Sequence, residues 1–470
     1  MLLKYFYDKE LAQASYMVGC SATGEALIID PSRDVQPYLD AASDEGLAIT
    51  HVTETHIHAD YVSGTRELAS QTGATIYLSD MGDADWKYGF ADEGIRLHDG
   101  DVFMVGNIKV EVLHTSGHTP ESISFIITDT ATADQPMGIF TGDFLFVGNI
   151  GRPDLLEESA GIMGTRELGA RQQFANVQRF KDLPDYLQIF PGHGAGSACG
   201  KGLGSIPSTT LGYEKLFNPA FQIDDEDTFV EWLLDGQPEA PKYFAQMKKV
   251  NKIGPTLLKE LEQPKVLSAD DFQNLLALGA QIIDIRSSSI VANSFVEGTL
   301  HIPASSQKFS TYVGWFLDYD QPLYLISTAD RIQDDVRRLR AIGADNIAGY
   351  LPAELVDSTA TIPQLTPEQV QNQMHKPNLF VIDVRGQSEH HDARIAGTVN
   401  YPMGFIKRYV DDLPHNTPII TQCASGTRSQ IVASWLKSHN FTNVSNLSGG
   451  IQGWQRANLP TITGAPVKVR

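Results

Sequence analysis

The stretch THIHADYVSG, residues 55–64, has the residue types and spacing of a metal site. His56, His58 and Asp60 alternate along it, and Tyr61 follows. Imidazole and carboxylate groups are the usual protein ligands of divalent metals, and here they come directly after the strand-like run ITHVTET. The pattern H-x-H-x-D usually continues with another histidine, so the tyrosine raises the question of how many metal ions the site holds.

Three more segments carry ligand-type residues. They are TSGHTPES with His118, IFTGDFLF with Asp143, and IFPGHG with His193. Each follows a hydrophobic run and precedes a turn that contains glycine. Strands that end on the same side of a sandwich bring such residues to one edge, so we expect this set to converge.

A second kind of chemistry is indicated by CASGTRS, residues 423–429. This loop follows the strand-like TPIITQ and opens the helical pattern SQIVASWLKSH. Backbone N–H groups of such a turn and helix N-terminus point toward the sulfur, where they stabilise a thiolate or a persulfide on Cys423. Arg428 adds a fixed positive charge toward an anionic sulfur donor or acceptor.

Alternating strands and helices are expected to position the first group of residues. EALIIDP and ITHVTET read as strands, VSGTRELASQTG and RELGARQQFANVQRF as helices, and EVLHTSGHTPESISFIITD as a β-rich stretch. We predict a first domain over residues 1–235. Proline and charge are more frequent over residues 236–265, where we expect a linker.

The rest of the chain contains a repeat. Four residue pairs match at a constant offset of 99: Asp284 with Asp383, Arg286 with Arg385, Gly298 with Gly397, and Pro303 with Pro402. This register within the same strand-then-loop pattern predicts two related domains, over residues 266–358 and 363–462. Five residues after the proline of QPLYLIS stands Ser327, whereas the corresponding count in TPIITQC reaches Cys423.

Composition limits the classes of partner. The chain has 470 residues and a formal net charge of −21, which argues against nucleic acid or an anionic membrane as a partner. No apolar run approaches the roughly 20 residues that span a bilayer. Three widely spaced cysteines form no disulfide framework, so we expect a cytoplasmic protein. The sequence leaves open whether the chain forms a homo-oligomer.

The ligand motifs resemble those of the metallo-β-lactamase superfamily, over roughly residues 1–230, and most closely its glyoxalase II and persulfide dioxygenase branches. The resemblance implies an αββα sandwich. In the two-metal members, His56, His58 and His118 would bind one metal, and Asp60, the missing histidine and His193 the other, with Asp143 bridging. In persulfide dioxygenases the resemblance assigns a single Fe(II) to His56, His118 and Asp143, an arrangement that leaves coordination positions open.

Tyr61 bears on the number of metals. A neutral phenol is a poor ligand for a divalent ion, and its pKa lies near 10, so a second metal site should be weak or empty. Other persulfide dioxygenases keep a histidine here and hold one iron, so the tyrosine supports a mononuclear site without being required for it. His58, Asp60 and His193 would orient ligands and bound water; alternatively, they are hydrogen-bonded residues at loop ends.

Two further residues fit a sulfur-containing substrate. Cys199 lies in SACGKG, six residues after His193, and fused bacterial persulfide dioxygenases carry a cysteine in such a segment. The alternative is a buried and inert thiol. Arg152 in GNIGRPDL would hold a carboxylate or phosphate of a low-molecular-weight thiol, or else is an ordinary surface arginine.

Residues 363–462 resemble the rhodanese sulfurtransferases. LFVIDVR, IAGTVNYP and LSGGIQGW match landmarks of that family, and a six-residue loop from Cys423 to Arg428 suits sulfur rather than a phosphoryl group. Arg394 stands where this family often has a histidine. The earlier copy has Ser327 in place of the nucleophile and a shorter loop to Arg331, so we expect it to be inactive in sulfur transfer.

Taken as a whole, the chain resembles the fused bacterial persulfide dioxygenase–rhodanese proteins. The resemblance implies α/β domains in series and Fe(II), one per chain. Thiol persulfides and sulfite would be the small-molecule partners, and dioxygen the co-substrate. Thiosulfate would form through Cys423. Two alternatives remain: a glyoxalase II-like metallohydrolase fused to a sulfurtransferase, and a non-enzymatic persulfide-binding scaffold.

Overall fold

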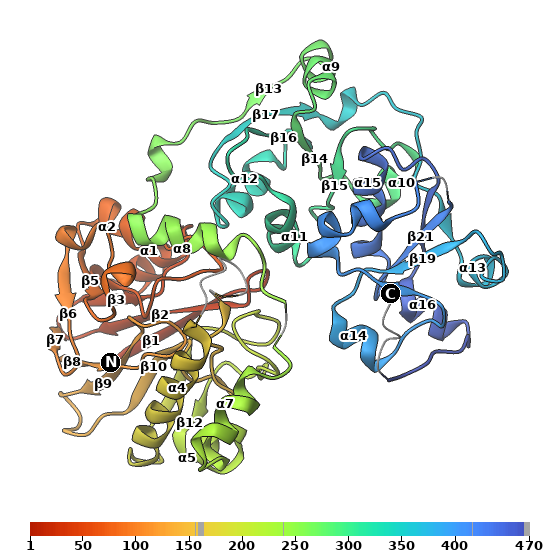
Figure 1. Cartoon of the computed structure of the whole chain (residues 1–470). Coiled ribbons are helices and arrows are strands. Elements are labelled where there is room, and N and C mark those ends of the chain that lie inside the picture. Colours follow the sequence, from red (N-terminus) through yellow and green to blue (C-terminus); the bar gives the residue numbers. More distant parts are fainter. Residues whose placement is uncertain (156, 158–163, 238, 416, 465–470) are drawn as a thin grey trace. The chain divides into compact units, whose positions relative to one another are not determined.

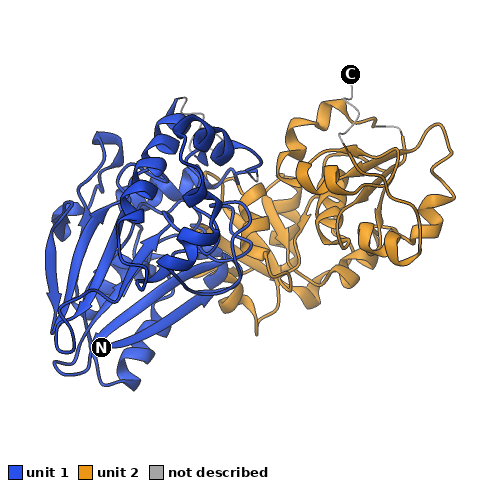
Figure 2. Ribbon diagram, turned by 90° about the horizontal axis from the view of Figure 1, so that it is seen from below, with its two compact units in different colours: residues 1–261, 337–343 blue, residues 262–336, 344–470 orange. Residues whose placement is uncertain are grey.

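The structure is a computed structural model that describes residues 1–155, 157, 164–237, 239–415 and 417–464. The chain divides into two compact units (Figure 2). Unit 1 comprises Met1–Leu261 with Arg337–Gly343, and unit 2 comprises Glu262–Val336 with Ala344–Arg470. The ligand motifs lie in unit 1 and the repeat lies in unit 2.

Unit 1 contains two six-stranded sheets (Figure 1). The first has the order β1 (Leu2–Asp8), β2 (Gln13–Cys20), β3 (Glu25–Ile29), β4 (Ala48–Thr53), β5 (Thr75–Ser79), β6 (Ile95–Leu97). The second has the order β12 (Thr209–Thr210), β11 (Gln188–Pro191), β10 (Gly138–Gly142), β9 (Ile123–Asp129), β8 (Ile108–His114), β7 (Val102–Val105).

The facing sides of the sheets form the central core. Along β8, Ile108, Val110 and Val112 are buried while Lys109 and Glu111 are half-buried. This period of two is the pattern of a strand with one face in the core. The buried side chains pack against residues of β2 and β3 from the other sheet.

Helices cover the outer face of each sheet. The first sheet packs against α1 (Gln36–Asp44) and α2 (Thr65–Thr72), and the second against α4 (Thr165–Lys181) and α7 (Glu226–Leu234). Short helices α5 (Leu211–Phe217) and α6 (Pro219–Gln222) lie between β12 and α7 in the chain. The layers are therefore αββα, and the expectation for this fold is confirmed.

The prediction of a linker over residues 236–265 is wrong for the middle part of that range. It contains α8 (Phe244–Ile253), which belongs to unit 1. Phe244, Met247 and Asn251 are buried at a spacing of three and four residues, which is the buried stripe of an amphipathic helix. Proline and charge at either end concealed this stripe in the sequence.

Unit 2 contains two five-stranded parallel sheets with the same topology. The first has the order β13 (Lys265–Val266), β17 (Ile347–Pro352), β16 (Leu323–Ser327), β14 (Gln281–Asp284), β15 (Leu300–His301). The second has the order β18 (Gln364–Leu365), β22 (Val444–Leu447), β21 (Ile419–Gln422), β19 (Phe380–Asp383), β20 (Val399–Asn400). If the strands of each copy are numbered from one to five along the chain, their order across the sheet is one, five, four, two, three.

Helices connect the parallel strands of unit 2, as crossover connections require. The first copy contains α9 (Ala269–Ala277), α10 (Ser288–Asn293), α11 (Phe309–Phe316) and α12 (Ile332–Arg340). The second copy contains α13 (Pro367–Gln371), α14 (Gln387–Asp392), the 3₁₀ segment η5 (Met403–Arg408), α15 (Thr427–Ser438) and α16 (Gly450–Arg456).

The repeat extends to individual hydrogen bonds. Arg286 Nη2 lies 2.6 Å from Asp284 Oδ2, and Arg385 Nη2 lies 2.6 Å from Asp383 Oδ2. Each arginine also donates to a backbone oxygen eight residues further along, at 2.7 Å in both copies. The aspartate–arginine pairs found in the sequence thus close the same turn after β14 and β19.

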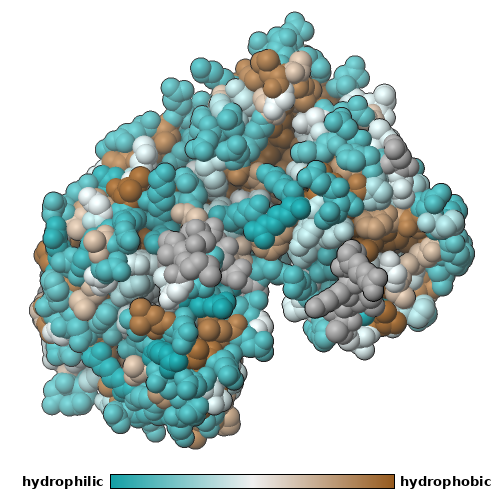
Figure 3. All heavy atoms as spheres, in the orientation of Figure 1, coloured by the Kyte–Doolittle hydropathy of each residue, from teal (hydrophilic) through white to brown (hydrophobic). Residues whose placement is uncertain are grey.

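The described helices include none that combines the length and apolar character needed to cross a bilayer. Hydrophilic side chains predominate over the face drawn in Figure 3. The apolar side chains that remain visible form separate groups, which is ordinary for a protein surface in contact with water.

Candidate metal centre and sulfur-transfer loop

The predicted ligands of unit 1 all follow the carboxyl ends of strands. His56 comes after β4 of the first sheet, whereas His118, Asp143 and His193 come after β8, β10 and β11 of the second. The αββα fold places these ends at one edge of the sandwich. Loops from two different sheets therefore build the site.

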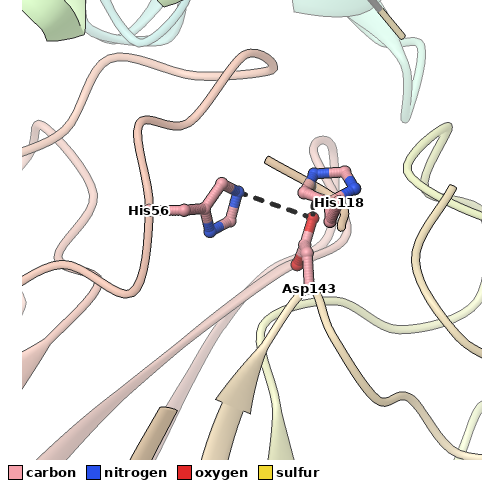
Figure 4. A group of neighbouring side chains, drawn as sticks. All are labelled: His56, His118 and Asp143. Carbon is pink, nitrogen blue, oxygen red and sulfur yellow. Dashed lines mark ion pairs between the residues drawn. The ribbon is translucent and has the colours of Figure 1, made fainter. Parts of the chain in front are cut away.

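Three of these side chains point toward one another (Figure 4). His56 Nε2 lies 3.8 Å and His118 Nε2 lies 3.4 Å from Asp143 Oδ2, and the ligand atoms of the three residues lie within 4.8 Å of one another. All three are buried. The structure thus assembles the two histidines and the carboxylate that the sequence analysis selected.

The donor atoms of this group fit a divalent metal. Asp143 Oδ2 has no hydrogen-bond partner among the described residues, although it is buried and faces both imidazoles. Burial holds the pKa of His56 well below its usual value and lowers that of His118 as well, against the attraction of Asp143. Neutral imidazoles and an ionised carboxylate are the forms that bind metals.

A second buried group adjoins the first. It contains Asp60, His193 and Cys199, whose ligand atoms also lie within 4.8 Å of one another. His193 connects the two groups, since its Nδ1 lies 2.7 Å from Asp143 Oδ1 and its Nε2 lies 2.7 Å from Asp60 Oδ2. Burial and the nearby carboxylates raise the pKa of Cys199. Cys199 therefore lies beside the candidate metal site, and its catalytic role stays a prediction.

Tyr61 does not serve as a metal ligand in this arrangement. Its side chain is buried, and its hydroxyl donates a long hydrogen bond of 3.4 Å to the backbone oxygen of Asp30. Burial first, and then the carboxylates of Asp30, Asp60 and Glu54, hold its pKa well above 10. A phenol in such surroundings stays protonated, and the centroid of its ring lies 4.5 Å from that of His58 with the two ring planes 35° apart.

Two acidic residues that the sequence analysis missed hold the His56 loop. Asp30 accepts from Thr55 N at 2.6 Å and lies 3.0 Å from His58 Nε2, while Glu121 accepts from Ile57 N at 2.7 Å. Burial raises the pKa of Glu121 to about 7. The sequence signal for Asp30 is its place directly after the apolar strand β3.

Helix α8 supports the same loop from behind. Asn251 donates through Nδ2 to the backbone oxygens of His58 and Tyr61, both at 2.7 Å, and its Oδ1 accepts from Ser63 N at 2.9 Å. A buried side-chain amide that satisfies three backbone groups holds a loop in one conformation. The residues of the expected linker thus help to position the metal ligands.

Arg152 is buried, whereas we expected it either to bind the substrate or to lie on the surface. It is 1% exposed, and its guanidinium forms two hydrogen bonds of 2.7 Å to Asp154. Its backbone also holds both groups together, because its oxygen lies 2.8 Å from His118 Nδ1 and its amide donates to the oxygen of Cys199 at 3.0 Å. These contacts give Arg152 a supporting role, and substrate binding by it stays a prediction.

In unit 2, Cys423 follows β21 and precedes α15. The thiol is 1% exposed. Gly426 N donates to Cys423 Sγ at 3.1 Å, and Ser429 Oγ donates to it at 3.3 Å. Gly426 has a φ of +103°, a backbone conformation that favours glycine and turns its amide toward the sulfur. The buried sulfur of Cys423 thus has donors from the loop and from the first turn of α15.

Arg428 of the same loop is paired with an acidic residue that the sequence analysis missed. Its two terminal nitrogens lie 2.7 and 2.8 Å from the carboxylate oxygens of Glu389 on α14. Burial works against the charge of Arg428, but pairing with Glu389 outweighs it, so the arginine pKa is raised. The charge of Arg428 is thus largely offset within the second copy.

The first copy has a hydrogen-bonded serine where the second copy has Cys423. Ser327 ends β16, and its Oγ donates to Asp335 Oδ2 at 2.9 Å. Asp335 is fully buried on α12 and also lies 3.1 Å from Arg331 Nη2. This copy retains the sheet and the loop position, whereas its hydroxyl is used to satisfy a buried carboxylate.

Comparison with known proteins identifies the family of unit 1. Residues 8–193 match the metallo-beta-lactamase superfamily. A crystal structure of a metallo-beta-lactamase from Staphylococcus aureus is 47% identical, covers 75% of this chain and 99% of that chain, and has a TM-score of 0.69. The chain belongs to the metallo-beta-lactamase superfamily.

Further matches cover smaller parts of the chain. Residues 366–457 match the rhodanese-like domain. A hydroxyacylglutathione hydrolase of Rhodospirillum rubrum is 33% identical over 185 residues, which are 38% of this chain. The chain spans about 60% of the length of the first curated relatives that it matches. ETHE1 from Myxococcus xanthus is 28% identical, covers 54% of this chain and 98% of that chain, and has a TM-score of 0.44.

Gly151 allows the metal-binding loops to approach closely. A Cβ at this position would overlap the backbone oxygen of Asp143 and lie 3.2 Å from His118 Nδ1. Gly151→Ala should displace both ligands and weaken metal binding by roughly 10- to 100-fold, the effect of disturbing groups that orient metal ligands. Metal titration checks this. Gly94→Ala, which meets the backbone of Ile76 instead, is the matched control and should reduce stability by about 1–3 kcal/mol with metal affinity unchanged.

Ser327→Ala tests the division between the two copies. Removal of the hydroxyl takes one donor from buried Asp335, so unfolding in urea should show a loss of about 1–2 kcal/mol. Sulfur transfer through Cys423 should keep its rate, because Ser327 donates to Asp335 and lies in the other copy. A large decrease in transfer rate without unfolding would contradict the assignment of Ser327 to a structural role.

Proposed function

We propose that this protein is a persulfide dioxygenase that uses one Fe(II), combined with a sulfurtransferase. The observation that carries the proposal is the make-up of the buried group of His56, His118 and Asp143, in a chain that also bears the Cys423 loop. Two histidines and one carboxylate on one side of a metal are typical of non-haem Fe(II) oxygenases. In the net reaction, a thiol persulfide, dioxygen and water give the thiol, sulfite and two protons.

The chain's own residues would hold the iron and shape its surroundings. His56, His118 and Asp143 would be the ligands, and Fe(II) when bound would supply the open positions and redox chemistry that dioxygen and a persulfide need. The backbone oxygen of Arg152 accepts a hydrogen bond from His118, and the ion pair of Arg152 with Asp154 fixes the position of that residue. The buried loops exclude bulk water from the donor atoms, which favours oxidation of the bound persulfide over side reactions.

Cys423 would carry out the second reaction. Its thiolate attacks the outer sulfur of a persulfide donor, the donor S–S bond breaks, and Cys423 keeps the outer sulfur as its own persulfide. Sulfite then attacks that sulfur, the new S–S bond gives thiosulfate, and the electron pair returns to Cys423 as thiolate. The hydrogen bonds from Gly426 and Ser429 support the thiolate both before and after the transfer.

A metallohydrolase is the second candidate, and the group of Asp60, His193 and Cys199 favours it. This group offers ligands for a second metal beside the first, and two-metal sites of that kind activate water for hydrolysis. The curated relatives include proteins named hydroxyacylglutathione hydrolase. Against it stands the protonated Tyr61, since its position in the H-x-H-x-D motif usually carries another metal ligand.

The metal content separates the two candidates. Protein purified without oxygen should contain one iron per chain and take up dioxygen when a thiol persulfide is added. Single alanine substitutions of His56, His118 and Asp143 should each remove the iron and the oxygen uptake together, because a set of three ligands has no spare member. The exposed His98 is the control: His98→Ala should keep both.

The same measurements show which outcome would contradict the proposal. Two tightly bound zinc ions with thioester hydrolysis and no oxygen uptake would favour the hydrolase. Full iron occupancy in any of the three alanine variants would exclude that residue as a required ligand. Circular dichroism and sulfur transfer through Cys423, which lies in the other unit, report whether each variant is folded.

Cys423→Ser separates the two reactions. Serine at neutral pH is a far weaker nucleophile than a stabilised thiolate, so this variant should form no enzyme persulfide and thiosulfate production should fall to background. Oxygen uptake should be preserved and the product should shift to free sulfite. Oxygen consumption and product speciation are measured on the same sample. Loss of oxygen uptake together with thiosulfate would mean that Cys423 supplies the iron site directly.

A further inference from the structure

The first copy in unit 2 packs closely against the second copy beside the Cys423 loop. Helix α11 lies on the η5 segment, with the rings of Trp315 and Phe405 5.2 Å apart at an angle of 75°. Lys407 Nζ donates to the backbone oxygen of Phe316 at 3.2 Å. A Cβ on Gly404 would overlap the indole of Trp315. The contact between α11 and η5 therefore leaves no room for a side chain at position 404.

Helix α15, which begins in the Cys423 loop, is attached to the first copy along one face. Three of its polar side chains, spaced four residues apart, bond to backbone groups of that copy. The bonds are Gln430 Nε2 to Ser288 O at 2.8 Å, His301 N to Ser434 Oγ at 2.9 Å, and Ser438 Oγ to Thr299 O at 2.7 Å. The loop and the first copy are thus held in one arrangement.

Two polar residues of the first copy lie along α11 on the face of Phe316, since positions 308, 312 and 316 are spaced four residues apart. Lys308 directly precedes α11; desolvation of its ammonium group and then the like charge of Arg428 lower its pKa, while Glu389 acts in the opposite direction. Tyr312, one turn further along, is half-buried. Burial raises its pKa, and the charges of Arg428, Cys423 and Glu389 act on it as well. Both side chains are therefore within electrostatic range of Arg428 and Glu389, and Tyr312 is also within range of Cys423.

The second copy alone offers little net positive charge at this place. Glu389 offsets Arg428 through two short contacts, whereas the persulfide of Cys423 and an incoming sulfite are both anions. Like charges brought together at a partly buried sulfur repel one another strongly. Lys308 brings a further positive charge to the pair of Arg428 and Glu389.

We propose that Lys308 and Tyr312 of the Ser327-containing copy complete the binding site for the sulfur oxyanion at Cys423. The ammonium group of Lys308 and the hydroxyl of Tyr312 bind oxygens of sulfite, so that its sulfur faces the outer sulfur of the persulfide. The copy that lost its nucleophile thereby becomes a specificity element of its partner copy. This inference rests on the proposed sulfur transfer through Cys423.

Steady-state transfer from a persulfide donor to two acceptors tests the inference. Sulfite is the anionic acceptor, and dithiothreitol is a neutral acceptor that has no use for Lys308. Lys308→Ala should raise the KM for sulfite about tenfold, which corresponds to one lost charge-assisted hydrogen bond. Its kcat with sulfite and both constants with dithiothreitol should stay within about twofold of the wild type.

Related variants separate charge from packing. Lys308→Arg should restore most of the affinity for sulfite, Lys308→Gln should not, and Tyr312→Phe should show a smaller increase in the KM for sulfite alone. Lys265→Ala removes the same charge from the exposed strand β13 and is the matched control. Added salt should weaken sulfite binding to the wild type more than to Lys308→Ala, since screening acts on the charge that the variant lacks.

Three outcomes would overturn the inference. They are an unchanged KM for sulfite in Lys308→Ala, an equal loss with sulfite and dithiothreitol, and no rescue by arginine. An equal loss with both acceptors would show that Lys308 acts on the structure of the loop. A wild-type protein that transfers sulfur to neither acceptor would instead overturn the sulfurtransferase function itself, so the two failures are distinguishable.

Discussion

The metal-binding unit depends on one buried carboxylate, that of Asp143. A carboxylate that leaves water needs cationic, hydrogen-bonding or metal partners, because an uncompensated buried charge costs several kcal/mol. His193 satisfies Oδ1, and Oδ2 faces His56 and His118. Burial raises the pKa of Asp143, but the surrounding histidines outweigh it, so the group stays ionised. Loops from two sheets must therefore meet at this carboxylate, and Asp30, Asn251 and Arg152 hold them there.

Unit 2 likewise buries a polar atom, the sulfur of Cys423, and it satisfies this atom with fewer groups. A single sulfur lies at the end of β21, where Gly426 N and Ser429 Oγ replace the water that it has lost. The duplicated copy preserves the sheet order and the Asp284–Arg286 turn, yet the hydroxyl of Ser327 is bonded to Asp335. Duplication thus separated the roles. The second copy retained the cysteine, and the first copy became free to change where it meets the Cys423 loop.

Several residues show how far sequence patterns reach. His56, His118 and Asp143 belong to a larger set of ligand-type residues after hydrophobic runs; family resemblance selected these three, and the structure brings them together. Cys423 could be placed by the strand before it and the helix after it. Asp30 and Glu389 were missed because an acidic residue after a strand or in a short helix looks the same whether it faces water or a buried partner. Arg152 looked available for a substrate, and only its contacts with Asp154 show how its charge is used.

The sequence by itself determined the alternation of strands and helices, the repeat in the second half of the chain and the residue types at the ends of the strands, and family resemblance added the αββα sandwich and the parallel sheets. Periodicity and turn residues act over a few neighbouring positions, so they can be read along the chain. Only the tertiary structure decided that α8 supports the metal ligands, that Cys199 joins Asp60 and His193, and that α11 lies against η5. These pairings depend on burial and electrostatics between segments far apart in the chain, and local sequence carries no measure of either.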